Sequence, residues 1–119
     1  ENITAVHKRA EDAGQDGSLR ESFDIALSRA VAPLSVLSEY CLPLVKPGGY
    51  FLAMKGPEPE TEADGAKGAI KELGGEIEKI KRLTIAEGMT HSVVIIKKIS
   101  QTPQKYPRKA GKPAKSPLK

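Results

Sequence analysis

The chain has 119 residues, of which 39% are hydrophobic, 29% charged and 4% aromatic, which suffices for one small domain with a modest core. Its apolar runs, such as residues 93–96, are too short to cross a bilayer, and residues 1–9 lack the apolar centre of a secretory signal. The single cysteine, Cys41, excludes an internal disulfide framework and fits a reducing compartment. Because the first residue is Glu1, we expect the chain to be a fragment of a longer protein.

Charge is divided unevenly along the chain. Residues 1–96 carry 11 Lys or Arg against 15 Asp or Glu, a net of −4, whereas residues 97–119 carry eight basic residues and no acid. That last stretch also holds four of the nine prolines, so it buries too little apolar surface to form its own core. We therefore expect a domain part over residues 1–99 and a basic tail over residues 100–119.

The tail places one aromatic residue among its cations. Tyr106 stands beside Arg108 and Lys109, a combination that is typical of proteins binding single-stranded or looped RNA. A solvated tail that only keeps the protein soluble is an equally good interpretation of the composition.

The first half of the chain predicts two strands and a helix. Residues 3–6 are a short β-prone run, and residues 23–27 are mostly apolar, as in a strand buried on both faces. The helix follows Pro33, and we expect Lys46-Pro47-Gly48-Gly49 to end it with a cation and two glycines. Its apolar residues recur at a spacing of three and four, namely Leu34, Leu37, Tyr40, Cys41 and Leu44.

The second half predicts a third strand, a helix and a hairpin. The strand covers residues 50–54, and the helix runs from about Glu60 to Leu73 before Gly74-Gly75. We expect this helix to be loosely held, since it contains Gly65 and Gly68. Two further strands, at residues 77–85 and 92–99, are close enough to pair as an antiparallel hairpin. This alternation of strands and helices favours an α/β fold with a largely parallel sheet.

The sequence carries no pattern for metal binding or nucleophilic catalysis. His7 and His91 are isolated, and Cys41 lies on the apolar face of the predicted helix, where a core thiol is the better interpretation. Neither a GxSxG nor a GxGxxG motif occurs. We therefore expect no metal site.

Polar residues follow three of the predicted strands. They are Arg9-Ala10-Glu11, Ser28-Arg29 and Lys55-Gly56, and ligands of open α/β sheets bind at the carboxyl ends of the strands. Strand ends are polar in most proteins, so their position alone does not define a site.

Six motifs, taken in order, resemble one family, RsmG (also called GidB), the bacterial methyltransferases that act on 16S ribosomal RNA. The Lys-Pro-Gly-Gly element is common among class I methyltransferases, whereas the first, third and last motifs in this order are specific. The motifs are Arg9-Ala10-Glu11, Phe23-Asp24-Ile25, Arg29-Ala30-Val31-Ala32, Leu44-Val45-Lys46-Pro47-Gly48-Gly49, Phe51-Leu52-Ala53-Met54-Lys55-Gly56 and Lys105-Tyr106-Pro107-Arg108-Lys109.

The resemblance implies both a fold and a reaction. The fold is the C-terminal half of a Rossmann-like class I S-adenosylmethionine-dependent methyltransferase sheet, containing strands three to seven of the order 3-2-1-4-5-7-6, with the last strand antiparallel. The reaction is methyl transfer from S-adenosyl-L-methionine to N7 of a guanine in the 530 loop of 16S rRNA, in the cytoplasm. Guanine N7 carries a lone pair and no proton, so positioning matters more than a general base.

The resemblance also implies site residues and partners. Ala10 and Glu11 fall on the adenosine side of the cofactor, and Arg29 falls on a cofactor-contacting arginine. The expected partner is 16S rRNA or the small ribosomal subunit, with no membrane involved. The residues expected to contact RNA are Lys55, Lys105, Tyr106, Arg108, Lys109 and Lys112.

The family's glycine-rich loop and ribose-binding acid are expected upstream of this chain. The chain alone should then bind the cofactor weakly and be inactive, and the strand at residues 23–27 should be an exposed apolar edge that favours self-association. The alternative function is a non-catalytic RNA-binding module that uses the basic tail. A nicotinamide-dependent dehydrogenase ranks third, because the tail and Arg9-Ala10-Glu11 have no place in it.

Overall fold

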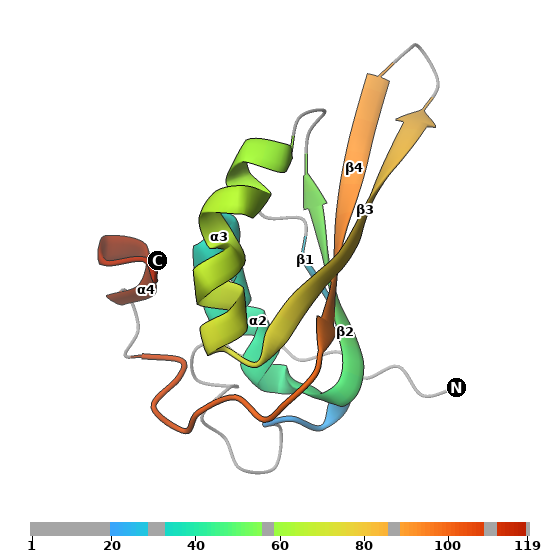
Figure 1. Ribbon diagram of the computed structural model, residues 1–119. Helices are drawn as coiled ribbons and strands as arrows, with labels where there is room; N and C mark the ends of the chain where they lie inside the picture. The colour runs from blue at the N-terminus through green and yellow to red at the C-terminus, as the bar shows by residue number, and fades with distance from the viewer. Residues whose placement is uncertain (1–19, 29–32, 56–58, 86–88, 109–111, 119) are drawn as a thin grey trace.

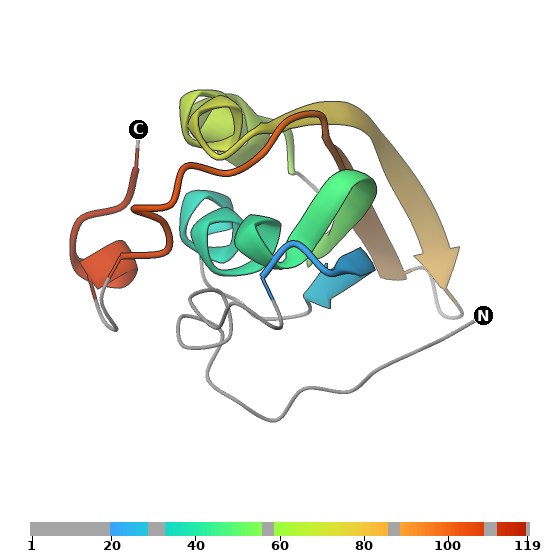
Figure 2. The ribbon, with the colours of Figure 1, turned by 90° about the horizontal axis from the view of Figure 1, so that it is seen from below.

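The computed structural model describes residues 20–28, 33–55, 59–85, 89–108 and 112–118. These residues form a four-stranded sheet with two helices packed on one of its faces (Figures 1 and 2). The predicted strand at residues 3–6 lies outside the described residues. In chain order the elements are β1 (Phe23–Ser28), α2 (Leu34–Cys41), the 3-10 turn η1 (Leu42–Leu44), β2 (Val45–Lys55), α3 (Glu60–Glu72), β3 (Gly75–Ile85), β4 (Met89–Lys98) and α4 (Lys112–Lys115).

The strands lie in the order β1-β2-β4-β3, so the last strand in the sequence enters between β2 and β3. β1 and β2 are parallel, whereas β4 runs antiparallel to both of its neighbours. The predicted hairpin and the antiparallel last strand are therefore confirmed. The expectation of a largely parallel sheet holds for the described strands: β1, β2 and β3 run in one direction, and only β4, which lies between β2 and β3, is reversed.

The core lies between the sheet and the two helices. Side chains alternate along the central strands, so that Phe51 and Ala53 of β2 and Val94 and Ile96 of β4 are fully buried beneath the helices. The opposite face is open at its edge, where Ile25 and Leu27 of β1 are 55% and 69% exposed. No described helix lies on that second face (Figure 2).

α3 is packed through small residues. Ala63, Ala66 and Ala69 are all buried, and their short side chains let α3 approach α2 and the sheet closely. Ile70 completes the buried face. The expectation of a loosely held helix is therefore wrong, because the buried alanine face offsets the weak helix propensity of the glycines.

Gly65 is expected to be replaceable by alanine with a gain in stability. It lies on the exposed face of α3, and a Cβ atom added there would meet no other atom within 4 Å. Alanine in a helix interior is favoured over glycine by about 0.5–1 kcal/mol, so the Gly65→Ala variant should unfold at a higher urea concentration. An unchanged or lower urea midpoint for Gly65→Ala would contradict the open, exposed position of Gly65.

The glycine pair Gly48-Gly49 does not end a helix. α2 has already ended at Cys41, η1 follows, and both glycines belong to an irregular start of β2, where Val45 pairs with Phe23 and Tyr50 with Ile25. Gly48 has a φ of 93°, and a Cβ atom on Gly49 would lie 2.4 Å from the carbonyl oxygen of Asp24. The predicted helix end is thus corrected: this motif allows β2 to approach β1 closely.

The other glycine pair behaves as predicted. Gly74, with a φ of 90°, follows the last turn of α3, where its N–H donates to the carbonyl of Lys71. Glycine is favoured at this position because a residue with a side chain would be strained at this backbone angle.

Residues 100–108, which we call the C-terminal strap, run below the lower ends of both helices in the view of Figure 1. Thr102 and Tyr106 of the strap are buried, being 3% and 5% exposed. The hydroxyl of Thr102 donates a 2.6 Å hydrogen bond to the carbonyl of Leu73, at the end of α3. The composition of the tail did not predict this packing, which joins the strap to the body of the fold.

Candidate functional site at the carboxyl edge of the sheet

Two strand ends and two helix starts meet at one edge of the sheet, which we call the carboxyl edge. β1 ends at Ser28 and β2 ends at Lys55, and the parallel pairing of these strands puts both ends on the same side. α3 begins beside the arrowhead of β2 (Figure 1). Helix N-termini carry partial positive charge, so this edge suits polar and anionic groups.

Glu62 connects three elements at this edge. Its Oε2 lies 2.9 Å from Nζ of Lys55 at the end of β2, and the same oxygen accepts a hydrogen bond from the backbone N–H of Leu34, the first residue of α2. The Lys55 side chain is 9% exposed and that of Glu62 is 35% exposed. The contact therefore joins β2, α2 and α3 in a setting where water screens the charges only partly.

The predicted cofactor contacts Ala10, Glu11 and Arg29 lie outside the described residues, as does Lys109. Ser28, the last residue of β1, lies at the carboxyl edge, and Arg29 is the next residue in the sequence. The role of these residues stays a prediction.

Three of the residues expected to contact RNA are engaged within the protein. Lys55 pairs with Glu62, and the ring of Tyr106 is buried while its hydroxyl donates to Oε2 of Glu72 at 3.2 Å. Arg108 binds the carboxylate of Glu39. The expected exposed stacking ring and phosphate-pairing arginine are corrected accordingly, because both side chains hold the strap against the helices.

Two other residues expected to contact RNA are exposed. Lys112 begins α4 and is exposed, and the side chain of Lys105 is 68% exposed. Nζ of Lys105 lies 5.3 Å above the ring of Tyr106 and 3.9 Å from a Glu72 carboxylate oxygen. These weak surface contacts leave Lys105 accessible to a partner.

The strap is held by a turn that sequence reasoning missed. Arg20 donates hydrogen bonds to three strap carbonyls, those of Thr102, Pro103 and Tyr106. The carboxylate of its neighbour Glu21 accepts a 2.8 Å hydrogen bond from the backbone N–H of Thr102. An arginine and a glutamate before a strand give no sequence signal for such contacts, because their partners lie more than 80 residues away.

Glu39 and Arg108 form an ion pair that joins α2 to the strap. The Glu39 side chain is fully buried on α2, and Arg108 reaches it with its backbone N–H, Nε and Nη2, the last at 2.8 Å from Oε1. These hydrogen bonds raise the pKa of Arg108, so its guanidinium stays charged. Arg108 also donates to the carbonyl of Ser116, just after α4.

Lys98 is a fully buried cation at the opposite end of the sheet. Its Nζ donates to the carbonyls of Leu42 at 2.6 Å and Val45 at 2.7 Å, and it lies 3.0 Å from Oε2 of Glu21. Burial lowers the pKa of Lys98, although the contact with Glu21 opposes this shift.

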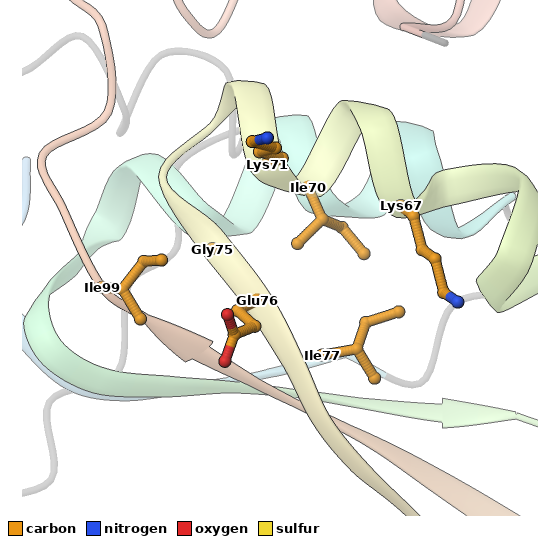
Figure 3. Close-up of a pocket in the computed structure, with 7 residues that line it drawn as sticks. All are labelled: Lys67, Ile70, Lys71, Gly75, Glu76, Ile77 and Ile99. Atoms are coloured by element: carbon orange, nitrogen blue, oxygen red, sulfur yellow. The ribbon is translucent and has the colours of Figure 1, made fainter.

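A groove of about 330 Å³ lies away from the carboxyl edge, between α3 and the start of β3 (Figure 3). Ile70 of α3 and Ile77 of β3 point into it from its two sides, and Lys67 and Lys71 of α3 also line it. None of the residues predicted to form a site lines this groove, so the carboxyl edge remains the candidate site.

Other chemistry finds no support in the described part of the chain. There, no three His, Cys, Asp or Glu side chains come together as a metal-binding group. Cys41 packs against the core, and burial raises the pKa of its thiol to about 12, as expected for an unreactive core cysteine. Within the same residues, no helix has the length and apolar character needed to span a membrane.

The strand order and the carboxyl edge define the class: this is part of a Rossmann-like class I methyltransferase fold, with four strands in the order expected for strands four, five, seven and six. The sequence pattern of one family agrees. The chain belongs to the GidB family, described as rRNA small subunit methyltransferase G, whose pattern matches residues 1–92.

Similar curated proteins carry the name "Ribosomal RNA small subunit methyltransferase G". That of Lactobacillus johnsonii is 53% identical over 119 residues, which cover 99% of this chain and 50% of that protein. That of Alkaliphilus oremlandii is 57% identical over 118 residues, covering 98% of this chain and 49% of that protein. The chain thus spans about half the length of the relatives it matches.

Proposed function

We propose that the protein carrying this chain transfers a methyl group from S-adenosyl-L-methionine to N7 of a guanine in the 530 loop of 16S rRNA, in the cytoplasm. The observation that carries the proposal is membership of the GidB family over residues 1–92. The mixed sheet supports it, because β1 and β2 end at one edge, where ligands of such sheets bind.

The chain's own part in this reaction is to bind and orient. When bound, S-adenosylmethionine supplies an electrophilic methyl group on its sulfonium. We assign Ala10 and Glu11 to the adenosine side of the cofactor and Arg29 to a contact beyond the end of β1. β1 ends at Ser28, and the next residue in the sequence is the assigned cofactor contact, Arg29. The end of β1 therefore suits one wall of such a site. Guanine N7 loses no proton on attack, so alignment is the main task.

The test is transfer of labelled methyl from S-adenosylmethionine into unmethylated 16S rRNA or small subunits. We expect activity from the protein extended to the full length of its relatives and none from the 119-residue chain alone. Mapping of the label should place it on guanine N7 in the 530 loop. Activity in neither protein would favour the alternative, an RNA-binding module that catalyses nothing.

RNA contacts outside the carboxyl edge are assigned to Lys105, Lys109 and Lys112. Lys105 and Lys112 are exposed, and cations of this kind position RNA through its phosphates. Replacing all three with glutamine should weaken binding to 16S rRNA and lower its dependence on salt. Unchanged binding in a filter assay would show that these three lysines do not contact the RNA.

Self-association through β1 is a further part of the proposal for the 119-residue chain. Among the described strands β1 has a single neighbour, β2, and it carries the exposed Ile25 and Leu27. Unpaired apolar edges of this kind pair with other chains. Sedimentation should show dimers that the Leu27→Lys variant loses, and a monomer at high concentration would contradict this.

A further inference from the structure

One residue at the carboxyl edge has no part in the predicted chemistry, yet it joins three elements. Glu62 lies in the first turn of α3, where the N-cap, Pro59, makes no side-chain capping hydrogen bond. Its carboxylate oxygen Oε2 accepts a hydrogen bond from the N–H of Leu34, one of the N–H groups at the start of α2 that no helical carbonyl can satisfy. The same oxygen pairs with Lys55, the last residue of β2.

This arrangement has a direct physical consequence for the edge. A carboxylate at a helix N-terminus interacts favourably with the helix dipole, and the carboxylate of Glu62 also caps the neighbouring helix α2. Because the Lys55 side chain is 9% exposed, water screens its attraction to Glu62 less than it would screen a fully exposed pair. The contact therefore fixes the end of β2 against the start of α2.

The two points that this contact fixes are also sequence neighbours of the predicted site. Leu34 begins α2 five residues after Arg29, and Lys55 ends β2 directly before residue 56. The chain segments that follow β1 and β2 thus join elements that Glu62 ties together. A cofactor bound against the carboxyl edge therefore depends on the position of both strand ends.

We propose that Glu62 is a positioning residue for methyl transfer, acting through Lys55 and the N–H of Leu34 to hold the carboxyl edge in its binding geometry. The proposal rests on the proposed function, since it takes that edge as one wall of the cofactor site. It also changes the role of Lys55, which acts as the partner of Glu62 and not as a contact to RNA.

The test compares matched variants of the full-length protein in the methyl-transfer assay. Glu62→Gln keeps an oxygen for the N–H of Leu34 but removes the charge that pairs with Lys55. Glu60→Gln is the control, because Glu60 lies in the same helical turn and pairs with Arg82 in an exposed contact. We expect Glu62→Gln to lower kcat/KM for S-adenosylmethionine by about tenfold to a hundredfold, mainly through KM, and Glu60→Gln to behave as the wild type.

The division between KM and kcat separates positioning from loss of structure. Partial unfolding reduces the amount of active enzyme and so lowers the apparent kcat, while KM is unchanged. A double variant, Lys55→Met with Glu62→Gln, should be no worse than the more damaging single variant, because both changes remove one contact.

The outcomes are distinct. If the wild type is active and Glu62→Gln matches Glu60→Gln, or if only kcat falls, the positioning role is wrong and the proposed function stands. If the effects of Lys55→Met and Glu62→Gln simply add, the two residues do not act together and the proposal is again overturned. If the full-length wild type transfers no methyl group, the proposed function fails and the positioning role fails with it.

Discussion

Replacing Arg108 with alanine is expected to lower the free energy of unfolding by about 3–5 kcal/mol. The substitution leaves the carboxylate of Glu39, which is fully buried on α2, without the guanidinium that pairs with it. It also removes the hydrogen bond to the carbonyl of Ser116, so α4 loses a contact with the strap. Urea titration followed by circular dichroism measures the change.

Two further variants test whether the buried charge is the cause. Lys105→Ala is the matched control, because Lys105 lies in the same strap but is 68% exposed and 3.9 Å from its acidic partner, so the expected loss is below about 1 kcal/mol. The double variant Glu39→Leu with Arg108→Met should be more stable than Arg108→Ala, since it leaves no charge unpaired. Equal losses for Arg108→Ala and Lys105→Ala would show that the pair contributes little.

Lys98→Met is expected to lower the free energy of unfolding by about 2–4 kcal/mol. Methionine fills much of the volume of the lysine chain, but it leaves the carbonyls of Leu42 and Val45 and the carboxylate of Glu21 without their shared donor. Lys97→Met is the control, because Lys97 points to the other face of β4. Losses of the same size for both variants would contradict this account.

The loss caused by Lys98→Met should also depend on pH. Burial lowers the pKa of Lys98 in the folded chain, so the folded state releases its proton at a pH where the unfolded state still holds it. Between the lowered pKa and the ordinary lysine value of about 10.4, stability rises with pH. Unfolding curves at pH 7 and pH 10 should therefore show a larger difference between wild type and Lys98→Met at pH 10.

The strands and helices were predictable because each depends on a pattern within a few residues. The apolar run at residues 23–27 became β1, and the leucine spacing after Pro33 became α2. The Gly48-Gly49 pair was assigned wrongly for the opposite reason. What these glycines allow is an approach to the carbonyl of Asp24, and local sequence shows neither Asp24 nor β1 as a neighbour.

The same distinction explains what could be predicted of the site. That the ends of β1 and β2 share an edge follows from parallel pairing, and the structure confirms it. The partners of Arg20 and Arg108 could not be predicted, because they lie 82 to 86 and 69 residues away along the chain. A basic, proline-containing segment was therefore expected in solvent, although two buried side chains and a buried carboxylate hold it on the helices.

The place of β4 in the sheet has a consequence for the order in which the chain can fold during its synthesis. β4 is made after every other strand of the described sheet, yet it lies between β2 and β3. Until residues 89–98 have left the ribosome, β2 lacks one of its two neighbours and β3 has none among the described strands. Closure of the sheet therefore awaits its last strand, and the edge of β2 that later pairs with β4 stays unpaired throughout the interval.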